Sequence, residues 1–359
     1  MKDKILYLSS VDLSRDSGVK IKLDEFISHC ISLGHNTLHY NYYNKSTLKK
    51  ARFFTGKILH TKAKKIYIRS LGNLHLSLFP AFVIARLSGK KIYLEFPTPR
   101  VAALKEVTSN KTRLKKITYS IRHYMNGPWI LLPVHRVIHY GNESPYFLFG
   151  SKHKTIIIGN SIDPNRVTQR KRSSRLNDED IYALGVANLT LSQGYDRFIR
   201  MLKQWNENSN NPRLYFTIVG DGNELENLKQ LVKKLNVENN VTFTGRLQSD
   251  KLYEMYDNHH IGIGSLGLFR KKLTLSSSLK IREYCLAGLP FMASGKDPDF
   301  PKDCAFRWLV KNEDETNSIS MALTQFIRLK DSVSDNNIRS YALENLSFEK
   351  NLKKIGLTD

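Results

Sequence analysis

A serine-rich loop and the short helix after it, residues 276–291, hold the residue types best suited to chemistry. Three serines at 276–278 stand where the helix should begin, and the first N–H groups of a helix attract anions because they lack internal partners. Lys280 adds positive charge, and Glu283 adds a carboxylate one turn further on. A phosphate held by the loop, beside a carboxylate that accepts hydrogen bonds from hydroxyls, is the chemistry of a nucleotide-sugar site. An ordinary helix closed by Gly288 explains the same pattern without a ligand.

A second candidate is Glu95, which ends the apolar run 91–96 and precedes a Pro-Thr-Pro loop. Glu106 is the only other carboxylate between Glu25 and Glu143. Ligands of parallel α/β sheets bind past the carboxyl ends of the strands, so we expect Glu95 to be a positioned catalytic carboxylate. The alternative is a charge that is balanced by nearby lysines.

The elements that must position these residues alternate between strands and helices. Apolar runs predict strands at 4–10, 36–43, 66–69, 91–96, 137–140, 154–163, 181–187, 213–219, 240–244, 260–264 and 289–293. Helical spacing predicts helices at 19–33, 45–60, 75–88, 101–125, 196–205, 224–235 and 249–257. This alternation predicts an α/β fold with parallel sheets and helices on both faces.

The chain is long enough for two domains. A polar, basic stretch without apolar periodicity follows the first set of elements, and it is typical of a linker. We therefore predict an N-terminal domain over 1–168, a linker over 169–179 and a second domain over 180–330. The last helices, 331–359, are expected to pack back on the N-terminal domain.

Positive charge is unevenly spread along the 359 residues, whose net charge is +23. Residues 1–168 hold 28 Lys and Arg against 9 Asp and Glu, whereas the rest of the chain is nearly balanced. Such a field favours a polyanionic surface, either anionic lipid or nucleic acid. No nucleic-acid recognition motif is present, which makes lipid the better interpretation.

The predicted helix 101–125 is basic and amphipathic, a pattern that suits a membrane interface. Its candidate lipid-contacting residues are Lys111, Arg113, Lys115 and Lys116. The alternative is a helix whose lysines simply face water. No run of about 18 apolar residues predicts a membrane-spanning helix, and no signal peptide is apparent.

Several common catalytic and metal motifs are missing from the sequence. It contains no P-loop, no Cys-x-x-Cys pair and no His-Glu-x-x-His. Cys30, Cys285 and Cys304 are scattered, which suggests reduced thiols in the cytosol. The acid pair Asp297 and Asp299 flanks a proline, and a loop turn explains it better than a metal site does. We therefore expect neither a bound metal nor a cofactor.

Six short motifs in the second half resemble those of the bacterial family-4 glycosyltransferases, which have the GT-B fold. They are Gly-Asn-Ser-Ile-Asp at 159–163, Ala-Asn-Leu at 187–189 with Gly-Tyr-Asp-Arg at 194–197, Val-Gly-Asp-Gly at 219–222, Phe-Thr-Gly-Arg-Leu at 243–247, Ile-Gly-Ser-Leu-Gly-Leu-Phe-Arg-Lys at 263–271 and Leu-Lys-Ile-Arg-Glu-Tyr-Cys-Leu-Ala-Gly-Leu-Pro-Phe at 279–291. The N-terminal half is similar more loosely, through Ser-Gly at 17–18 and Leu-Glu-Phe-Pro-Thr-Pro at 94–99. The resemblance implies two Rossmann-like domains that face a central cleft, the second of which binds a nucleotide-sugar donor.

The resemblance also implies roles for particular residues. Glu283 matches the second of two family glutamates and would bind the ribose hydroxyls, whereas Leu275 stands in place of the first. Asn188 and Gln193 stand where the family has an arginine and a lysine that grip the donor diphosphate. Either Arg270, Lys271 and Lys280 have taken over that task or the activity is impaired, and we expect the former because these cations flank the serine loop. The predicted donor-binding residues are Gly18, Asn188, Gln193, Gly220, Arg246, Leu247, Arg270, Lys271, Ser277, Ser278, Lys280 and Glu283.

The function implied is that of a retaining, metal-independent glycosyltransferase of capsule, exopolysaccharide or lipopolysaccharide synthesis. It would move a sugar from a nucleotide diphosphate donor to a glycan on a polyprenyl-diphosphate lipid. Its place would be the bacterial cytoplasm, peripheral on the inner face of the cytoplasmic membrane. Two alternatives stay open: an inactive glycosyltransferase-like accessory protein, and another GT-B enzyme such as a sugar-nucleotide epimerase.

Overall fold

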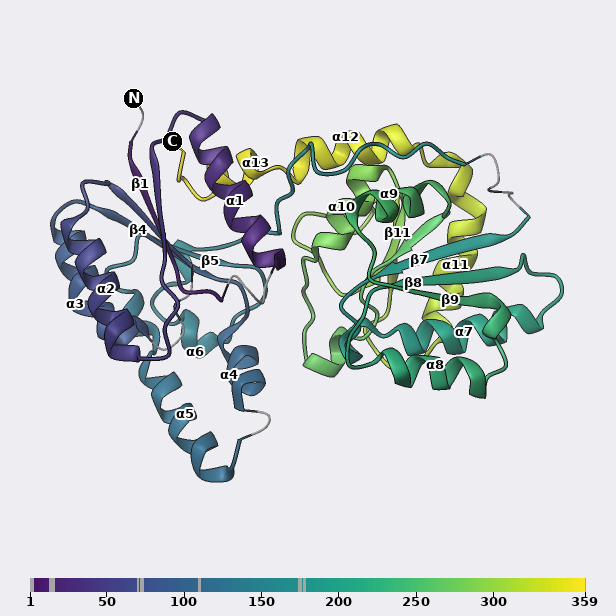
Figure 1. Cartoon of the computed structure of the whole chain (residues 1–359), viewed down its shortest axis with the longest axis horizontal. Helices are drawn as coiled ribbons and strands as arrows, with labels where there is room; N and C mark the ends of the chain where they lie inside the picture. The colour runs from purple at the N-terminus through teal and green to yellow at the C-terminus, as the bar shows by residue number, and fades with distance from the viewer. Residues whose placement is uncertain are drawn as a thin grey trace. The chain divides into compact units, whose positions relative to one another are not determined.

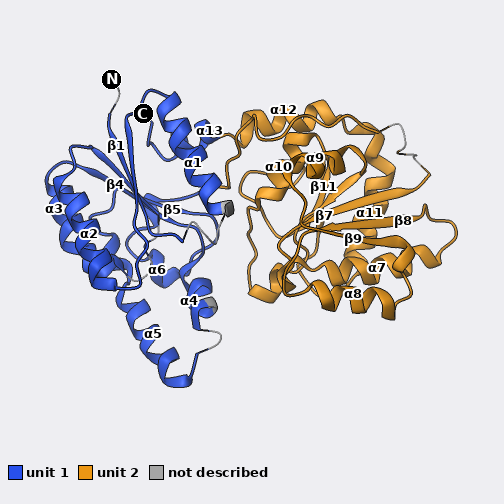
Figure 2. Cartoon of the chain, viewed as in Figure 1, with its two compact units in different colours: residues 1–158, 348–359 blue, residues 159–347 orange. Residues whose placement is uncertain are grey.

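The computed structural model describes residues 3–358 except 13–16, 70, 72–73, 109–110, 174–175 and 177–178. The chain divides into two compact units (Figure 2). The first consists of Met1–Ile158 together with Phe348–Asp359, and the second is Gly159–Ser347. Each unit has its own sheet and its own buried clusters of apolar side chains.

The first unit is built on a six-stranded parallel sheet with the strand order β2-β1-β3-β4-β5-β6 (Figure 1). Its described strands are β1 Ile5–Ser9, β2 Thr37–Asn41, β3 Lys65–Arg69, β4 Lys91–Phe96, β5 Arg136–His139 and β6 Thr155–Ile157. Its described helices are α1 Ser17–Ser32, α2 Thr47–His60, α3 His75–Leu87, α4 Arg100–Thr108, α5 Arg113–Met125, α6 Pro145–Leu148 and α13 Phe348–Lys354, with short 3₁₀ turns at η2 Pro128–Leu131 and η3 Lys152–Lys154.

Helices cover both faces of this sheet. On one face, Leu6 of β1 shares a buried cluster with Phe54 of α2 and Phe82 of α3. On the other face, Tyr7 belongs to a cluster that includes Leu352 of α13 and residues of α1. Burial on both faces is why the strands of a parallel sheet read as nearly continuous apolar runs in the sequence.

The C-terminal segment returns to the first unit and is tied to its sheet. The Lys65 ammonium donates to the Leu357 carbonyl at 2.9 Å, and the Tyr93 hydroxyl donates to the Gly356 carbonyl at 2.6 Å. The returning segment begins at Phe348, later than the predicted 331. The helix before it stays with the second unit, because its Ile338 and Ala342 are buried in that unit's core.

The predicted helix 101–125 is two helices, α4 and α5, which is a correction to the sequence interpretation. Thr108 ends α4 and turns its hydroxyl back to the Leu104 carbonyl at 2.8 Å, and Thr112 is the N-cap of α5. Threonine, serine and asparagine compete with helical hydrogen bonds through their side chains, and 108–112 consists mostly of such residues. Residues 109–110 lie outside the described part of the chain.

The second unit contains another six-stranded parallel sheet, with the order β12-β11-β10-β7-β8-β9. Its described strands are β7 Ile181–Val186, β8 Leu214–Val219, β9 Val241–Gly245, β10 Ile261–Ile263, β11 Phe291–Ser294 and β12 Arg307–Val310. Its described helices are α7 Tyr195–Glu207, α8 Leu225–Lys234, α9 Ser249–Asp257, α10 Leu279–Ala287, α11 Asn317–Leu329 and α12 Asp335–Asn345, with 3₁₀ turns at η4 Leu191–Gln193, η5 Glu238–Asn240, η6 Leu268–Lys271 and η7 Lys330–Ser332. The predicted α/β class with two parallel sheets is confirmed; strand β12 was not predicted.

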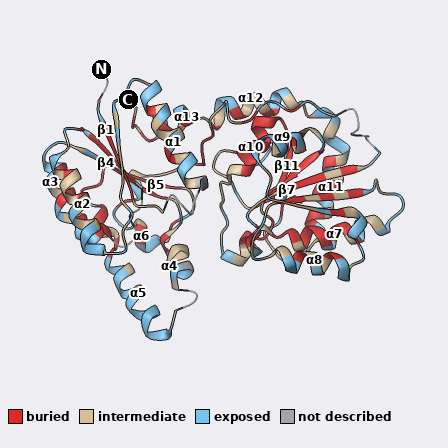
Figure 3. Cartoon of the chain, in the orientation of Figure 1, coloured by how far each residue is buried: buried red, intermediate tan, exposed pale blue. Residues whose placement is uncertain are grey.

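The order of the second sheet creates a switch point beside β7. The chain runs from β7 to β8 on one side, and β10 returns to the other side of β7. The loops that leave β7 and β10 therefore begin on neighbouring strands at the carboxyl edge of the sheet, where ligands of such sheets bind. The central strands are buried and the loops at the edge are partly exposed (Figure 3).

The segment predicted as a linker, 169–179, packs on the second unit where it is described. The Arg170 guanidinium is buried and pairs with both carboxylate oxygens of Asp335, at 2.8 and 2.7 Å. The Lys171 amide donates to Asp257 Oδ1 at 2.8 Å. The sequence of this stretch resembles a linker because it is polar, and the carboxylates that pair with its residues are distant in sequence. The unit boundary falls at residue 158, before the predicted 168.

Candidate functional site

The loops at the carboxyl edge of the second sheet brace one another through backbone contacts. The Leu189 amide donates to the Asp221 carbonyl at 2.8 Å, and the Leu266 amide donates to the Gln193 carbonyl at 2.8 Å. Gly220 has a φ of 133°, and a Cβ at this position would overlap the Ala187 carbonyl oxygen. Glycine is therefore required where the loop after β8 approaches the loop after β7.

Lys280 is the central cation of this edge. Its ammonium donates to Gln193 Oε1 at 2.7 Å and to the Tyr195 hydroxyl at 3.1 Å, and the residue is only 9% exposed. Ser265 also donates to Gln193 Oε1, at 3.0 Å. Burial lowers the pKa of Lys280 from 10.5 to about 7. Among the described residues no carboxylate pairs with this ammonium, so its charge has only neutral partners.

The serine loop before α10 is fixed from the start of the second unit. Asn160, in the Gly-Asn-Ser motif, donates its backbone amide to Ser277 Oγ at 2.5 Å and its side-chain amide to the Ser277 carbonyl. Ser278 is the N-cap of α10, and its hydroxyl does not bond to the first turn. Ser265, Ser276 and Ser278 line one cavity of about 20 Å³. The structure thus assigns Ser277 a partner within the protein and leaves the Ser278 hydroxyl beside the helix start.

The predicted acid pair is neutralised inside the unit. Arg282 is fully buried and pairs with Asp297 and Asp299, and its Nε donates to the Asn160 carbonyl at 3.0 Å. Gly159 packs directly on this cluster. Within the described residues no group of three His, Cys, Asp or Glu could hold a metal ion. The two aspartates therefore hold a loop turn in place through a guanidinium.

Arg270 and Lys271 differ in the partners that the structure gives them. Arg270, on η6, makes two bonds to the Asp196 carboxylate, at 2.7 and 2.8 Å, and one to Asp314 at 3.1 Å. These carboxylates, Asp196 first, raise the pKa of Arg270. Lys271 is exposed at the end of η6. The Arg270 charge is therefore already balanced within the protein.

The other predicted donor residues lie around the same edge. Asn188 is exposed in the loop after β7, and its carbonyl accepts from the Gln193 side chain at 3.4 Å. Arg246 is 77% exposed in its side chain and lies 3.9 Å from Asp221, and Leu247 packs against the core. Gly18 is the second residue of α1, which belongs to the first unit.

Glu283 is paired with an arginine that the sequence gave no reason to select. Arg166 Nε lies 2.9 Å from Glu283 Oε1, and both side chains are largely buried. Burial raises the pKa of Glu283, while Arg166 opposes that shift. Leu275 is half-buried and bridges to Lys296 through its backbone, so it offers no second carboxylate. Arg166 was missed because it lies just before the predicted linker, in a polar stretch without apolar periodicity.

Glu95 is the last residue but one of β4 in the first unit and is 2% exposed. Its Oε1 lies 2.6 Å from Arg69 Nη1, and the two residues are register partners on β4 and β3. Burial raises the pKa values of Tyr7 and Tyr67, and the Glu95 carboxylate adds to both shifts. The partner of Glu95 is an arginine on the neighbouring strand, not the nearby lysines that the alternative proposed. Its catalytic role stays a prediction.

The four predicted lipid-contacting cations lie at or near the start of α5, where Arg113, Lys115 and Lys116 are exposed and Lys111 is half-buried. No residue of α5 is buried, so its apolar side chains also face outward (Figure 3). Within the described residues, no helix combines the length and the apolar character that crossing a bilayer requires.

Comparison with known proteins supports the predicted resemblance. Residues 167–264 match the family described as Glycosyl transferases group 1. The O-antigen biosynthesis glycosyltransferase WclY of Escherichia coli is 33% identical over 107 residues, which cover 28% of this chain and 29% of WclY. The chain thus spans less than a third of the length of the curated relatives that it matches.

Solved structures match over nearly the whole chain. Anabaena Alr3699/HepE in complex with UDP has a TM-score of 0.67 at 15% identity, with 99% of each chain covered. WaaG, a glycosyltransferase involved in lipopolysaccharide biosynthesis, has a TM-score of 0.62 at 15% identity, covering 98% of this chain and 99% of WaaG. The predicted GT-B fold is therefore confirmed, and the chain carries a group 1 glycosyltransferase segment over 167–264.

Proposed function

We propose that this chain, which carries a group 1 glycosyltransferase segment in a GT-B fold, transfers a sugar from a nucleotide-diphosphate donor. The observation that carries the proposal is the cluster at the switch point of the second sheet. There a buried ammonium, Lys280, has only neutral partners and lies in the first turn of α10, beside the serine loop. A cation without a carboxylate, next to unpaired helix N–H groups, favours a bound phosphate.

Lys280 supplies the charge that the family pattern leads us to expect elsewhere. Gln193 stands in place of the family lysine, and the Lys280 ammonium lies 2.7 Å from the Gln193 side-chain oxygen. The positive charge has therefore moved to a different backbone position while staying near the same part of the site. Arg270 is paired with Asp196 and Asp314, and Lys271 is exposed to water, which weakens its attraction for a phosphate. We therefore assign the donor diphosphate to Lys280.

The same ammonium would act on the reaction itself. When the bond from the sugar to the diphosphate breaks, negative charge builds up on the leaving phosphate. A fixed cation in a water-poor site stabilises that charge more than water does, and it needs no reorganisation at the moment of transfer. The Gln193 and Tyr195 oxygens hold the Lys280 ammonium in place before the donor arrives.

Glu283 would accept hydrogen bonds from the ribose hydroxyls. Arg166 helps to keep the Glu283 carboxylate ionised, because burial alone raises its pKa. An ionised carboxylate accepts hydrogen bonds but donates none, which suits a partner that offers two hydroxyls. Arg166 thus positions the Glu283 carboxylate and binds no sugar itself.

We propose that the acceptor is a membrane-bound intermediate of surface polysaccharide synthesis. Of the proteins named above, WclY is described as an O-antigen biosynthesis glycosyltransferase and WaaG as involved in lipopolysaccharide biosynthesis. The cationic first half and the outward-facing apolar residues of α5 suit a lipid-linked glycan at the inner face of the cytoplasmic membrane. Transfer would retain the anomeric configuration and need no metal.

A thermal-shift screen of the full-length chain against UDP-, GDP- and dTDP-sugars tests the donor site. A nucleotide sugar at about 100 times its Kd should raise the unfolding free energy by about 2.7 kcal/mol. Glu283→Ala should lose that shift, whereas Glu226→Ala, on the exposed face of α8, should keep it. A chain that is stabilised by none of these nucleotides, and that releases no nucleotide from them, is not a glycosyltransferase.

One observation favours a second candidate, an inactive accessory protein. Leu275 offers no carboxylate where the family has its first glutamate, so half of that acidic pair is missing. The two candidates separate on turnover: an accessory protein would show a nucleotide-induced thermal shift without release of the nucleotide diphosphate.

A further inference from the structure

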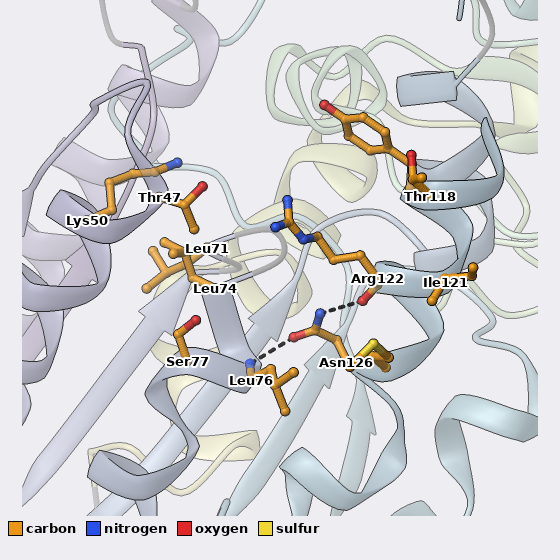
Figure 4. A pocket seen from close by; sticks show the side chains of 12 residues that line it. Thr47, Lys50, Leu71, Leu74, Leu76, Ser77, Thr118, Ile121, Arg122 and Asn126 are labelled. Carbon is orange, nitrogen blue, oxygen red and sulfur yellow. Dashed lines mark hydrogen bonds between the residues drawn. The ribbon is translucent and has the colours of Figure 1, made fainter. Parts of the chain in front are cut away.

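The first unit holds a groove of about 690 Å³ that none of the donor residues lines. Its walls are the start of α2, the start of α3 with the residues just before it, and α5 (Figure 4). This volume lies within the range of about 300–1,000 Å³ that is typical of small-molecule sites.

The groove is lined by aliphatic side chains from two sides. Leu71 and Leu74 are buried at its floor. Across from them, Ile121 and Met125 of α5 are 57% and 51% exposed although they line the same space. The apolar side chains of a helix are normally covered by the rest of the protein. Apolar side chains that are exposed next to one another mark a binding surface.

Two cations reach toward the opening of the groove. Lys50 of α2 and Arg122 of α5 extend from opposite walls toward the space between them (Figure 4). Neither has a carboxylate partner among the described residues, and no described residue that lines the groove is acidic. Thr47, Ser77 and Thr118 add hydroxyl groups to the same walls. An anion at this opening would meet two positive charges and no negative one.

The α5 wall is fixed to the rest of the unit at its C-terminal end. Asn126 is buried, accepts from the Leu76 amide at 2.8 Å and donates to the Arg122 carbonyl at 2.8 Å. Both bonds are drawn in Figure 4. The Asn126 side chain therefore joins the start of α3 to the last turn of α5, and its bond to the Arg122 carbonyl helps to hold the Arg122 backbone in place.

We propose that this groove binds one aliphatic chain that ends in a phosphate group, the lipid end of the acceptor. The aliphatic walls cover the chain, and Lys50 and Arg122 bind the phosphate. The proposal rests on the proposed function, which calls for a lipid-linked acceptor. A second copy of this protein is a poorer occupant, because it brings the same excess of positive charge to a groove that already has two cations.

Farnesyl phosphate, farnesol and inorganic phosphate are the probes, titrated into the full-length chain by calorimetry below the micelle concentration. We expect farnesyl phosphate to bind at least about ten-fold more tightly than either farnesol or inorganic phosphate, because each offers only half of the contacts. Equal affinity for inorganic phosphate, or no saturable binding of farnesyl phosphate, would overturn the proposal.

Matched variants separate the groove from the general surface. Ile121→Asp should lower the affinity for farnesyl phosphate by about ten-fold or more, since it puts a charge against the aliphatic chain of the lipid. Leu87→Asp, at an 83% exposed leucine of α3 outside the groove, should leave the affinity unchanged. The double variant Lys50→Ala and Arg122→Ala should lower the affinity for farnesyl phosphate about ten-fold and leave the affinity for farnesol unchanged. If both aspartate variants weaken binding equally, the lipid does not use the groove.

Two further measurements distinguish failure of this site from failure of the proposed function. Sugar transfer to a water-soluble acceptor by a chain that does not bind farnesyl phosphate would reject the groove alone. Farnesyl phosphate binding by a chain that no nucleotide sugar stabilises would reject the proposed transferase alone. Self-association that Ile121→Asp abolishes, without lipid binding, would identify the groove as a protein interface and overturn the proposal.

Discussion

Replacing Lys280 by methionine should remove the pH dependence of donor binding. In the free protein the pKa of this ammonium is about 7 because of burial, and a bound diphosphate must raise it. Below pH 7 the ammonium is already protonated and the donor binds at full strength. Above pH 7 the protein must first take up a proton, so affinity should fall by up to about ten-fold per pH unit.

The measurement is the Kd of UDP-glucose between about pH 6 and about pH 8.5, since the diphosphate diester stays ionised over this range. Wild type should lose affinity by about ten-fold or more across the upper part of the range. Lys280→Met should bind more weakly at pH 6 and show no slope. Lys229→Met, on an exposed lysine of α8, is the matched control and should retain the wild-type slope. A wild-type affinity that does not change with pH, or a slope that survives in Lys280→Met, would refute the assignment.

The same variant has a second, independent signature in stability. The drop of the pKa from 10.5 to about 7 means that the charged form destabilises the folded chain by about 5 kcal/mol. Between about pH 7 and pH 10.5 the unfolded chain still holds this proton, whereas the folded chain has released it. The free energy of unfolding of the wild type should therefore rise with pH over this range, by up to about 1.4 kcal/mol per pH unit. Lys280→Met lacks the titrating group and should be more stable than wild type near pH 7, by an amount that shrinks as the pH rises.

Three other predictions follow from the contacts described above. Arg282→Met leaves Asp297 and Asp299 buried without their cation and should lower the unfolding free energy by about 3–5 kcal/mol in chemical denaturation. Gly159→Ala places a Cβ on the same cluster and should lower the thermal midpoint, with a loss of about 1–3 kcal/mol, whereas Gly56→Ala meets no neighbour and should not. Reversing the charges of Lys111, Arg113, Lys115 and Lys116 to glutamate should abolish cosedimentation with anionic vesicles; wild-type binding should fall steeply with salt, and salt-independent binding would contradict the electrostatic explanation.

The fold class could be predicted from the sequence because the spacing of apolar residues and the residues that end helices are local features. Alternating apolar strands and capped helices predicted both parallel sheets, and Gly288 does end α10 in a left-handed conformation with a φ of 87°. The order of strands within each sheet was not predicted, because it depends on long-range pairing. The break between α4 and α5 was missed because the apolar spacing continues through it.

The candidate site was harder to predict because charge pairing is not local. Arg166 meets Glu283 across 117 positions and Arg170 meets Asp335 across 165 positions. Neither contact leaves a trace in spacing or composition, so a buried arginine was taken for part of a linker. Lys280 and Gln193 were both named from the motif, but only the structure shows that the ammonium of one lies beside the amide of the other.

Which cation can bind a donor phosphate depends on how its charge is already used. Near the carboxyl edge of the second sheet, Arg282 is held by two aspartates and Arg270 by two more carboxylates, so an incoming phosphate would have to compete with fixed partners. Arg246 is exposed, where water weakens any attraction. Lys280 alone among these four is both buried and paired only with neutral groups. Its low pKa and its fitness for a diphosphate have the same cause, since a buried charge without a counter-ion is destabilised until an anion binds. A loss of the family lysine at Gln193 is therefore compatible with a working donor site, provided that the replacement charge is kept unpaired.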